Sequence, residues 1–179
     1  EFLVNLGVKV WKDVRVTNYD GQTITTSSDL AFETETVIWT AGVQGASIAG
    51  IDGSALVKNV ERIRVNEFNQ VQGYDNIFAV GDIAMMEMEK YPRGHPMMAQ
   101  PALQQGKLLG NNIIKLLNNQ KMVPFKYNDK GSMATIGRNK AVVDLPNYHF
   151  SGVFAWFVWM FVHLFSLIGF KNKAVVFMN

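Results

Sequence analysis

The sequence contains no cysteine among its 179 residues, which excludes disulfide bonds and thiolate metal sites within the chain. A strong excess of charge is also missing, since 17 basic and 15 acidic side chains leave a formal net charge of +2. We therefore expect no basic stripe and no nucleic-acid partner. The three histidines, His95, His149 and His163, lack the spacing of metal ligands, so no metal site is expected.

The first residues do not resemble a signal peptide, and the end of the chain differs from them in composition. Residues 1–6 have no initiating methionine, no basic start and no long apolar core, so they read as the middle of a longer protein. Residues 151–170 contain no Asp, Glu, Lys or Arg and are rich in Trp, Phe, Val and Leu. This composition favours contact with lipid or a deep core.

The apolar tail has two possible relations to a bilayer. A helix over residues 151–170 would be roughly 30 Å long, which is enough to span the hydrocarbon layer. The polar His163 and the glycines weaken a span, whereas the aromatic residues and the following Lys171 and Lys173 favour a helix lying at the interface. We expect the interfacial arrangement.

Short strands are predicted in the first part of the chain. Residues 8–16 end in an alternation of apolar and polar side chains, which is typical of a half-buried strand. Asp20-Gly21 favours a tight turn, and Thr23–Thr26 would then complete a hairpin.

Two apolar runs each end in small residues. The run Val37-Ile38-Trp39-Thr40-Ala41-Gly42 predicts a buried parallel strand, and its glycine permits close approach of another group. The run Ile77-Phe78-Ala79-Val80 predicts a strand that ends in a tight turn at Gly81-Asp82. A ligand's polyol can pack on Gly81 and hydrogen-bond to Asp82, or Asp82 can simply cap the turn.

The second half of the chain mixes a helix with strands. A helical pattern begins at Met97, directly after Pro96, and residues 133–143 predict two short strands around a turn at 137–140. Together with the earlier runs, these elements predict an α/β (α+β) fold.

The chain resembles the two-dinucleotide-binding-domain flavoproteins at two places. Residues 77–82 resemble the second FAD signature of that superfamily, and residues 37–42 resemble the strand by which its chain returns from the NAD domain to the FAD domain. The resemblance implies that Gly81 and Asp82 hold FAD, with Asp82 bonding the ribitol. It also implies that Thr40, Ala41 and Gly42 border the nucleotide sites.

A third segment narrows the resemblance to type II NADH:quinone oxidoreductases. Ala99-Gln100-Pro101-Ala102-Leu103-Gln104 is similar to the A-Q-x-A-x-Q element of that family, and residues 131–142 and 155–173 resemble its C-terminal strand pair and membrane-associating helix. Gln100 and Gln104 lie on one helix face, where their amides can donate to quinone carbonyl oxygens. By resemblance these glutamines act in catalysis, Ala99 and Gln100 border the flavin, and the helix N-terminus can stabilise an anionic reduced flavin.

The resemblance implies a domain order and a function. We expect the C-terminal part of an NAD-binding domain over residues 1–44, the C-terminal part of an FAD-binding domain over 45–122 and a membrane-associating domain over 123–179. The longer parent would transfer electrons from NADH through FAD to a membrane quinone. We expect it to be a homodimer, attached peripherally through residues 151–170 to the cytoplasmic face of the cell membrane.

A glycine-rich turn of the form G-x-G-x-x-G is absent from the sequence, although the superfamily uses one for each dinucleotide. We therefore expect this chain alone to bind FAD and NADH poorly and to be inactive. Two alternatives remain open at this point. One is a soluble flavoprotein reductase of the disulfide or ferredoxin type, and the other is a membrane-anchoring module without enzymatic activity.

Overall fold

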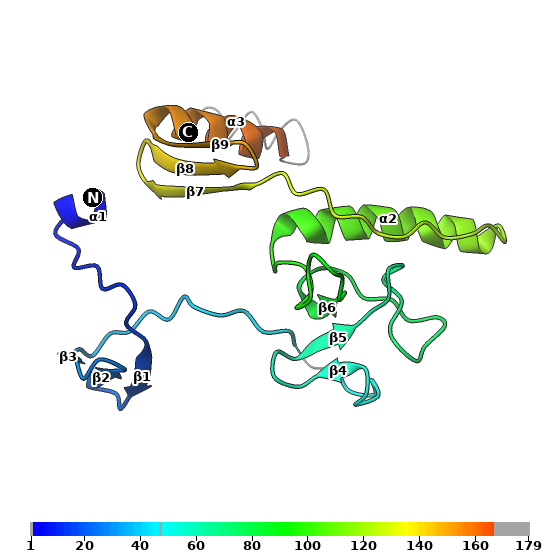
Figure 1. Ribbon diagram of the computed structural model, residues 1–179, viewed down its shortest axis with the longest axis horizontal. Helices are drawn as coiled ribbons and strands as arrows, with labels where there is room; N and C mark the ends of the chain where they lie inside the picture. Colours follow the sequence, from blue (N-terminus) through cyan, green and yellow to red (C-terminus); the bar gives the residue numbers. More distant parts are fainter. Residues whose placement is uncertain (1, 47, 167–179) are drawn as a thin grey trace. The chain divides into compact units, whose positions relative to one another are not determined.

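A computed structural model of the protein describes residues 2–46 and 48–166 (Figure 1). The chain forms two compact units, Glu1–Gly42 and Val43–Asn179. The predicted membrane segment extends to residue 170 and its lysines follow at 171 and 173, so residues 167–173 of that prediction lie outside the described part.

The first unit is built around a small antiparallel sheet with strand order β1-β2-β3. Its elements are α1 (Phe2–Asn5), β1 (Val16–Tyr19), β2 (Thr23–Thr26) and β3 (Ala31–Glu33). The predicted hairpin is confirmed, although its first strand begins at Val16 and not near residue 8. The turn forms because Asp20 Oδ1 accepts the N–H groups of Gln22 and Thr23 at 2.8 and 2.7 Å, and Gly21 adopts a φ of +101°.

The strand predicted over residues 37–42 is not present in the structure, and this prediction is wrong for the described chain. Its large side chains at Ile38 and Trp39 are exposed, with 82% and 64% of their surface accessible to solvent. A buried parallel strand exists only where neighbouring strands satisfy its backbone groups, and no described residue pairs with this run.

The second unit begins with a short sheet of order β4-β5-β6. Its first elements are β4 (Leu56–Val57), β5 (Arg62–Arg64), the 3₁₀ turn η1 (Gly81–Ile83) and β6 (Ala84–Met85). The predicted strand at 77–80 is an extended segment with a single β-bridge at Phe78, held by bonds from Val71 N to Ile77 O and from Ala79 N to Asn69 O. The core beneath it contains Ala55, Ile63, Val65, Val71, Ala79, Ala84, Met86 and Phe125.

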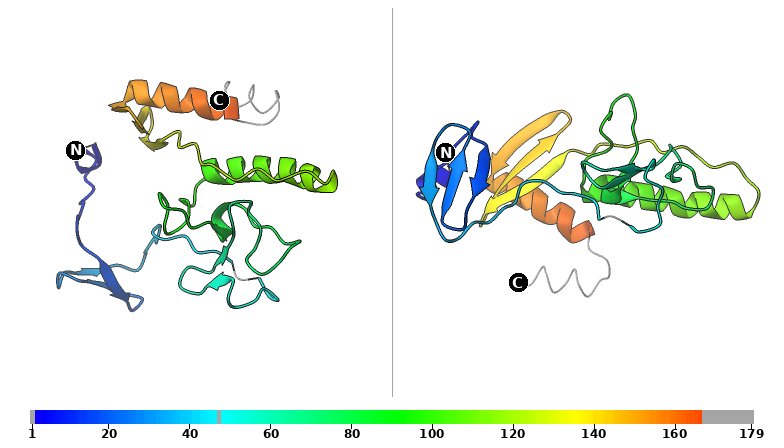
Figure 2. Two further views of the ribbon diagram at one scale, coloured as in Figure 1. Left: turned by 45° about the vertical axis from the view of Figure 1, so that its right-hand side comes forward. Right: turned by 90° about the horizontal axis from the view of Figure 1, so that it is seen from below.

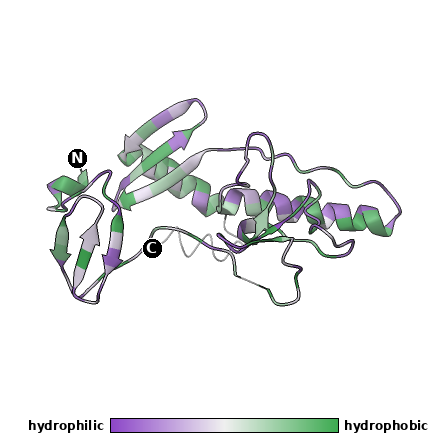
Figure 3. Ribbon diagram, turned by 60° about the horizontal axis from the view of Figure 1, so that its bottom comes forward, coloured by the Kyte–Doolittle hydropathy of each residue, from purple (hydrophilic) through white to green (hydrophobic). Residues whose placement is uncertain are grey.

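The long helix α2 (Ala99–Leu117) confirms the helical prediction. It starts after an extended Met98, carries Lys115 in its last turn and is followed by Asn119 with a φ of +54°. Its sequence alternates hydrophilic and hydrophobic bands (Figure 3). Beyond its end the chain turns back and runs along the helix, as both Figure 1 and the right view of Figure 2 show.

The chain continues into a three-stranded antiparallel sheet and a helix. These elements are β7 (Ser132–Gly137), β8 (Lys140–Leu145), β9 (Tyr148–Gly152) and α3 (Val153–Ser166). The predicted strand pair is confirmed, and the sheet adds β9, which the sequence pattern did not reveal. Helix α3 covers the sheet through a small core that includes Ala141, Val143 and Ala155. Within the described residues, no helix combines the length and the apolar character needed to cross a membrane.

Candidate functional site

The Gly81-Asp82 turn packs directly on the first turns of α2. Gly81 has a φ of +74°, a backbone conformation that residues other than glycine rarely adopt. A Cβ atom added at Gly81 would lie 3.3 Å from Ala102 Cβ, so the helix leaves little room for a side chain there. Asp82 is exposed in the same turn. The predicted carboxylate therefore stands at the surface, beside the N-terminal half of α2.

Gln105 fixes this contact, and the sequence analysis missed it. Its side-chain Oε1 accepts the N–H of Gly81 at 2.7 Å, and the residue is 1% exposed. Gln105 lies three residues after Ala102, so both face the turn from one side of the helix. The sequence did contain a signal for this role. Gln105 directly follows the motif that ends at Gln104, and it lies three residues after Ala102 on the helix.

The two predicted catalytic glutamines lie on α2 in different surroundings. Gln104 uses its amide in a pair of hydrogen bonds with the backbone of Asn128, donating to the carbonyl at 2.9 Å and accepting from the N–H at 3.0 Å. Gln100 is half-buried in the first turn of the helix. No side chain caps the start of α2, so the N–H groups of Ala99 and Gln100 are not bonded by a capping side chain, and the positive end of the helix dipole lies there too.

A buried guanidinium lies close to the turn. Arg62 is 4% exposed and donates to the carbonyl oxygens of Ala84, His95 and Arg93 at 2.6, 3.2 and 3.3 Å. Burial lowers the pKa of Arg62, and the negative charge of Asp82 acts in the opposite direction. Arg62 thus ties the start of β6 to the loop that leads into α2.

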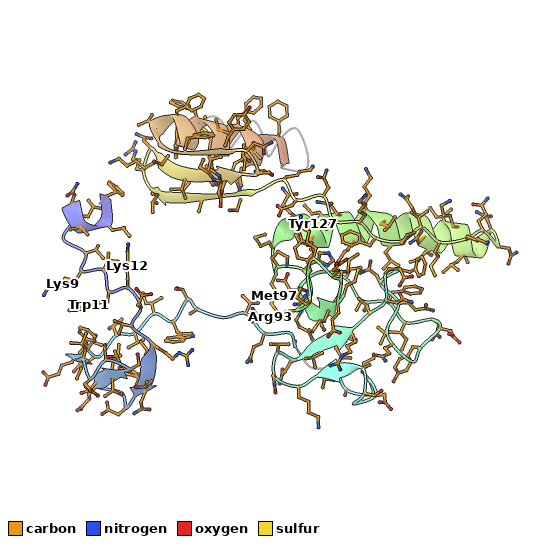
Figure 4. All side chains as sticks on the ribbon, in the orientation of Figure 1. Lys9, Trp11, Lys12, Arg93, Met97 and Tyr127 are labelled. Carbon is orange, nitrogen blue, oxygen red and sulfur yellow. The ribbon has the colours of Figure 1, made fainter. Side chains whose placement is uncertain are left out.

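His95 is enclosed by aromatic rings. The centroid of its ring lies 4.7, 5.2 and 5.4 Å from the centroids of Tyr91, Phe125 and Tyr127, and the residue is 2% exposed. Neither ring nitrogen has a hydrogen-bond partner among the described residues. Burial first, and then the charge of Arg62, lower the pKa of His95, which favours the neutral imidazole. Tyr127, labelled in Figure 4, lines one pocket together with Met98, the residue that precedes α2.

The remaining predicted site residues belong to the other unit. Thr40, Ala41 and Gly42 lie in exposed, irregular chain at the end of the first unit, whereas Gly81 and Asp82 belong to the second. Their role at a nucleotide site stays a prediction. Across residues 2–46 and 48–166, no group of His, Asp or Glu side chains is arranged to hold a metal ion.

Models of two protein families match the chain. Residues 1–106 match the model described as pyridine nucleotide-disulphide oxidoreductase, and residues 130–179 match the NDH2 C-terminal domain. Because the first match covers more than half of the sequence, the chain belongs to the pyridine nucleotide-disulphide oxidoreductase family.

Curated relatives that match the chain are named type II NADH:quinone oxidoreductases. The chain is 35% identical over 188 residues to the type II NADH:quinone oxidoreductase Ndh of Mycobacterium tuberculosis, covering 99% of this chain and 39% of that protein. It is 27% identical to the Haemophilus influenzae enzyme, covering 81% of this chain and 32% of that protein. The resemblance seen in the sequence is confirmed, and the chain spans two fifths or less of the length of these relatives.

Solved structures show the same fold. The NDH2 of Plasmodium falciparum in complex with NADH matches with a TM-score of 0.82 at 20% identity, over 99% of this chain and 52% of that chain. The sulfide:quinone oxidoreductase of Aquifex aeolicus matches with a TM-score of 0.63 at 18% identity, over 88% and 40% of the two chains. The predicted mixed α/β flavoprotein fold is confirmed at this level.

Proposed function

We propose that this chain is part of a flavoprotein that transfers electrons from NADH through FAD to a membrane quinone. One observation carries the proposal. The flavin-type turn at Gly81-Asp82 is locked by Gln105 onto the helix whose first turns bear Gln100 and Gln104. The names of the relatives, which specify NADH and quinone, support this acceptor over a disulfide or a ferredoxin.

The geometry of the turn fits a flavin nucleotide. The missing Cβ of Gly81 lets the turn pack closely on Ala102 of α2, and the exposed Asp82 carboxylate can accept hydrogen bonds from ribitol hydroxyls. The uncapped start of α2 offers N–H groups and a positive dipole to an adjoining anion. When bound, the flavin supplies the two-electron chemistry. We propose that Thr40, Ala41 and Gly42 border the nucleotides through their backbone.

The quinone contact is proposed for the glutamines of α2. A primary amide has two N–H groups, and Gln104 directs one of them to the Asn128 carbonyl. Its second N–H and the amide of Gln100 are the groups proposed to donate to the quinone carbonyl oxygens. Donation there stabilises the negative charge that develops during reduction.

The membrane contact is proposed for α3. Phe154, Phe157, Phe161 and Phe165 are 69, 53, 60 and 62% exposed, and their spacing places them along one side of the helix. Such an aromatic stripe suits a helix lying in the membrane interface and brings a lipid-soluble acceptor close to the protein. Peripheral attachment at the cytoplasmic face and assembly as a homodimer belong to the same proposal.

The test uses Gln100→Leu in the full-length parent. Leucine keeps the size of the side chain but removes its donors. We expect reoxidation of the reduced flavin by a short-chain quinone to slow roughly tenfold, the effect of one lost hydrogen bond to a charged acceptor. Stopped-flow absorbance should show NADH bleaching the flavin at the wild-type rate.

The matched control is Gln120→Leu, which alters an exposed glutamine beyond the end of α2. It should leave both half-reactions unchanged. An equal loss of both half-reactions in Gln100→Leu would argue against the quinone contact. A parent that oxidises NADH without reducing any quinone would refute the proposed function itself.

A further inference from the structure

The segment 123–128, which we call the strap, runs back along α2 from its C-terminal end toward its N-terminal end (Figures 1 and 2). It has no regular secondary structure and forms no β-ladder. Its backbone polar groups must therefore find partners elsewhere. Two side-chain amides of α2 provide partners for its first and last residues.

Asn112 holds the beginning of the strap. Its Oδ1 accepts the N–H of Val123 at 2.9 Å, and its Nδ2 donates to the carbonyl of the same residue at 2.8 Å. Asn112 is 0% exposed. The amide thus imitates the edge of a neighbouring β-strand, satisfying both polar groups of one strap residue.

Gln104 holds the end of the strap in the same way, through the N–H and carbonyl of Asn128. It lies about two helical turns before Asn112. Between the two pairs, Phe125 inserts into the core at 3% exposure, and its N–H donates to Glu67 O at 2.7 Å. The strap is therefore fixed at both ends and in its middle.

We propose that Asn112 is a positioning residue that anchors the strap, and that the anchored strap orients the Gln104 amide. Only asparagine has both a donor and an acceptor at this reach, because aspartate lacks the donor and leucine lacks both. When Asn112 holds Val123, the backbone of Asn128 lies where it can hydrogen-bond to the Gln104 amide. The chain then continues to β7, which begins at Ser132. The consequence for quinone reduction rests on the proposed function, whereas the anchoring does not.

The first experiment measures release of the strap in the full-length holoprotein. Proteolysis of folded chain requires local release of the segment that is cut, so the rate of tryptic cleavage after Lys126 reports release of the strap, and mass spectrometry identifies that cleavage. In Val123→Pro the strap loses the N–H that Asn112 accepts, at a side chain that is 44% exposed and should not disturb folding. We expect cleavage after Lys126 to become roughly tenfold faster in Val123→Pro and in Asn112→Leu.

One control changes the same position as a test variant, and the other makes the same substitution at a neighbouring position. Val123→Ala retains the N–H, and Asn111→Leu changes an exposed neighbour of Asn112 in the same helix. Both should be cleaved at the wild-type rate. If Asn112→Leu does not fold, Val123→Pro decides the question. Cleavage of Val123→Pro at the rate of Val123→Ala would overturn the proposal.

The second experiment separates anchoring from catalysis. In Val123→Pro we expect reoxidation of the flavin by quinone to slow severalfold, while NADH bleaches the flavin normally and flavin content is unchanged. A released strap with an unchanged quinone rate would overturn the positioning role. If the wild-type parent does not reduce quinones at all, the proposed function fails, and the cleavage result still decides whether Asn112 anchors the strap.

Discussion

Neighbouring glutamines on α2 serve different backbone groups. Gln104 pairs with Asn128 of the strap, whereas Gln105 accepts the N–H of Gly81 from within the core. They do so because successive residues of a helix point about 100° apart. Two adjacent side chains thus connect one helix to the flavin-type turn and to the segment that leads into the C-terminal sheet.

The bond from Gly81 to Gln105 predicts a graded effect of substitution. Gln105→Leu leaves the Gly81 N–H without its acceptor, so we expect the parent to retain FAD less tightly by about 1 to 3 kcal/mol. Gln105→Glu keeps an acceptor oxygen and should retain more flavin than the leucine variant. Flavin absorbance after dialysis measures both, and equal occupancy in all three proteins would contradict this role.

The lowered pKa of the buried His95 leads us to expect that the folded protein loses stability at acid pH. Its pKa is lowered in the folded protein from an ordinary value of 6.5, so the unfolded chain binds a proton more readily. The contribution of the neutral ring to the free energy of unfolding is therefore complete above pH 6.5. It falls as the pH decreases below that value, by at most about 1.4 kcal/mol per pH unit. Arg62, Tyr91 and Tyr127 are the charged and titratable groups facing the ring.

Thermal unfolding of the parent between pH 7 and 5 checks this expectation. His95→Phe retains the aromatic contacts and removes the titrating group, so its melting temperature should fall less than that of the wild type across this range. Parallel curves for wild type and His95→Phe would show that another group governs acid stability.

At the scale of elements, α3 differs from α2 in what its faces contact. Helix α2 buries polar side chains at Gln105 and Asn112, and each of them satisfies a backbone group. Helix α3 buries Ala155 against the sheet and exposes a stripe of phenylalanines to its surroundings. An exposed apolar surface of this kind is costly in water unless another apolar phase covers it.

The stripe predicts that membrane attachment depends on α3. Phe157→Ser combined with Phe161→Ser removes two exposed rings, which should weaken binding of the parent to anionic liposomes at least tenfold because each buried ring contributes about 1.5 to 3 kcal/mol. Tyr148→Ser removes a ring that is 69% exposed on β9 and serves as the control. Flotation with liposomes measures the difference. Equal flotation of both variants would exclude the stripe as the lipid contact.

At the scale of the whole molecule, the sequence lacks the phosphate-binding turn that the proposed flavin site requires. No G-x-G-x-x-G sequence is present, so the groups that grip dinucleotide phosphates in this superfamily are missing here. We expect residues 1–179, purified alone with added FAD, to emerge from gel filtration without flavin absorbance. A parent chain containing both glycine-rich turns should retain the flavin under the same conditions. Stable yellow colour in the isolated chain would contradict this expectation.

Local chemistry made several elements predictable. The turn at Asp20-Gly21, the helix after Pro96 and the strand pair around 137–140 each rest on contacts between residues close in the sequence. The run at 37–42 was predicted incorrectly because its pattern describes a strand only if other strands adjoin it. Gly81, Asp82, Gln100 and Gln104 were recognisable from motifs, and their family was recognisable with them.

The sequence by itself determined the family, the positions of the glycine-acid turn and the paired glutamines, and the apolar character of the tail. Only the tertiary structure decided what Gln104, Gln105 and Asn112 contact, and that His95 is buried among aromatic rings. The physical reason is that a motif records which residues are near one another along the chain. A hydrogen bond such as that from Gly81 to Gln105 joins residues that only folding brings together.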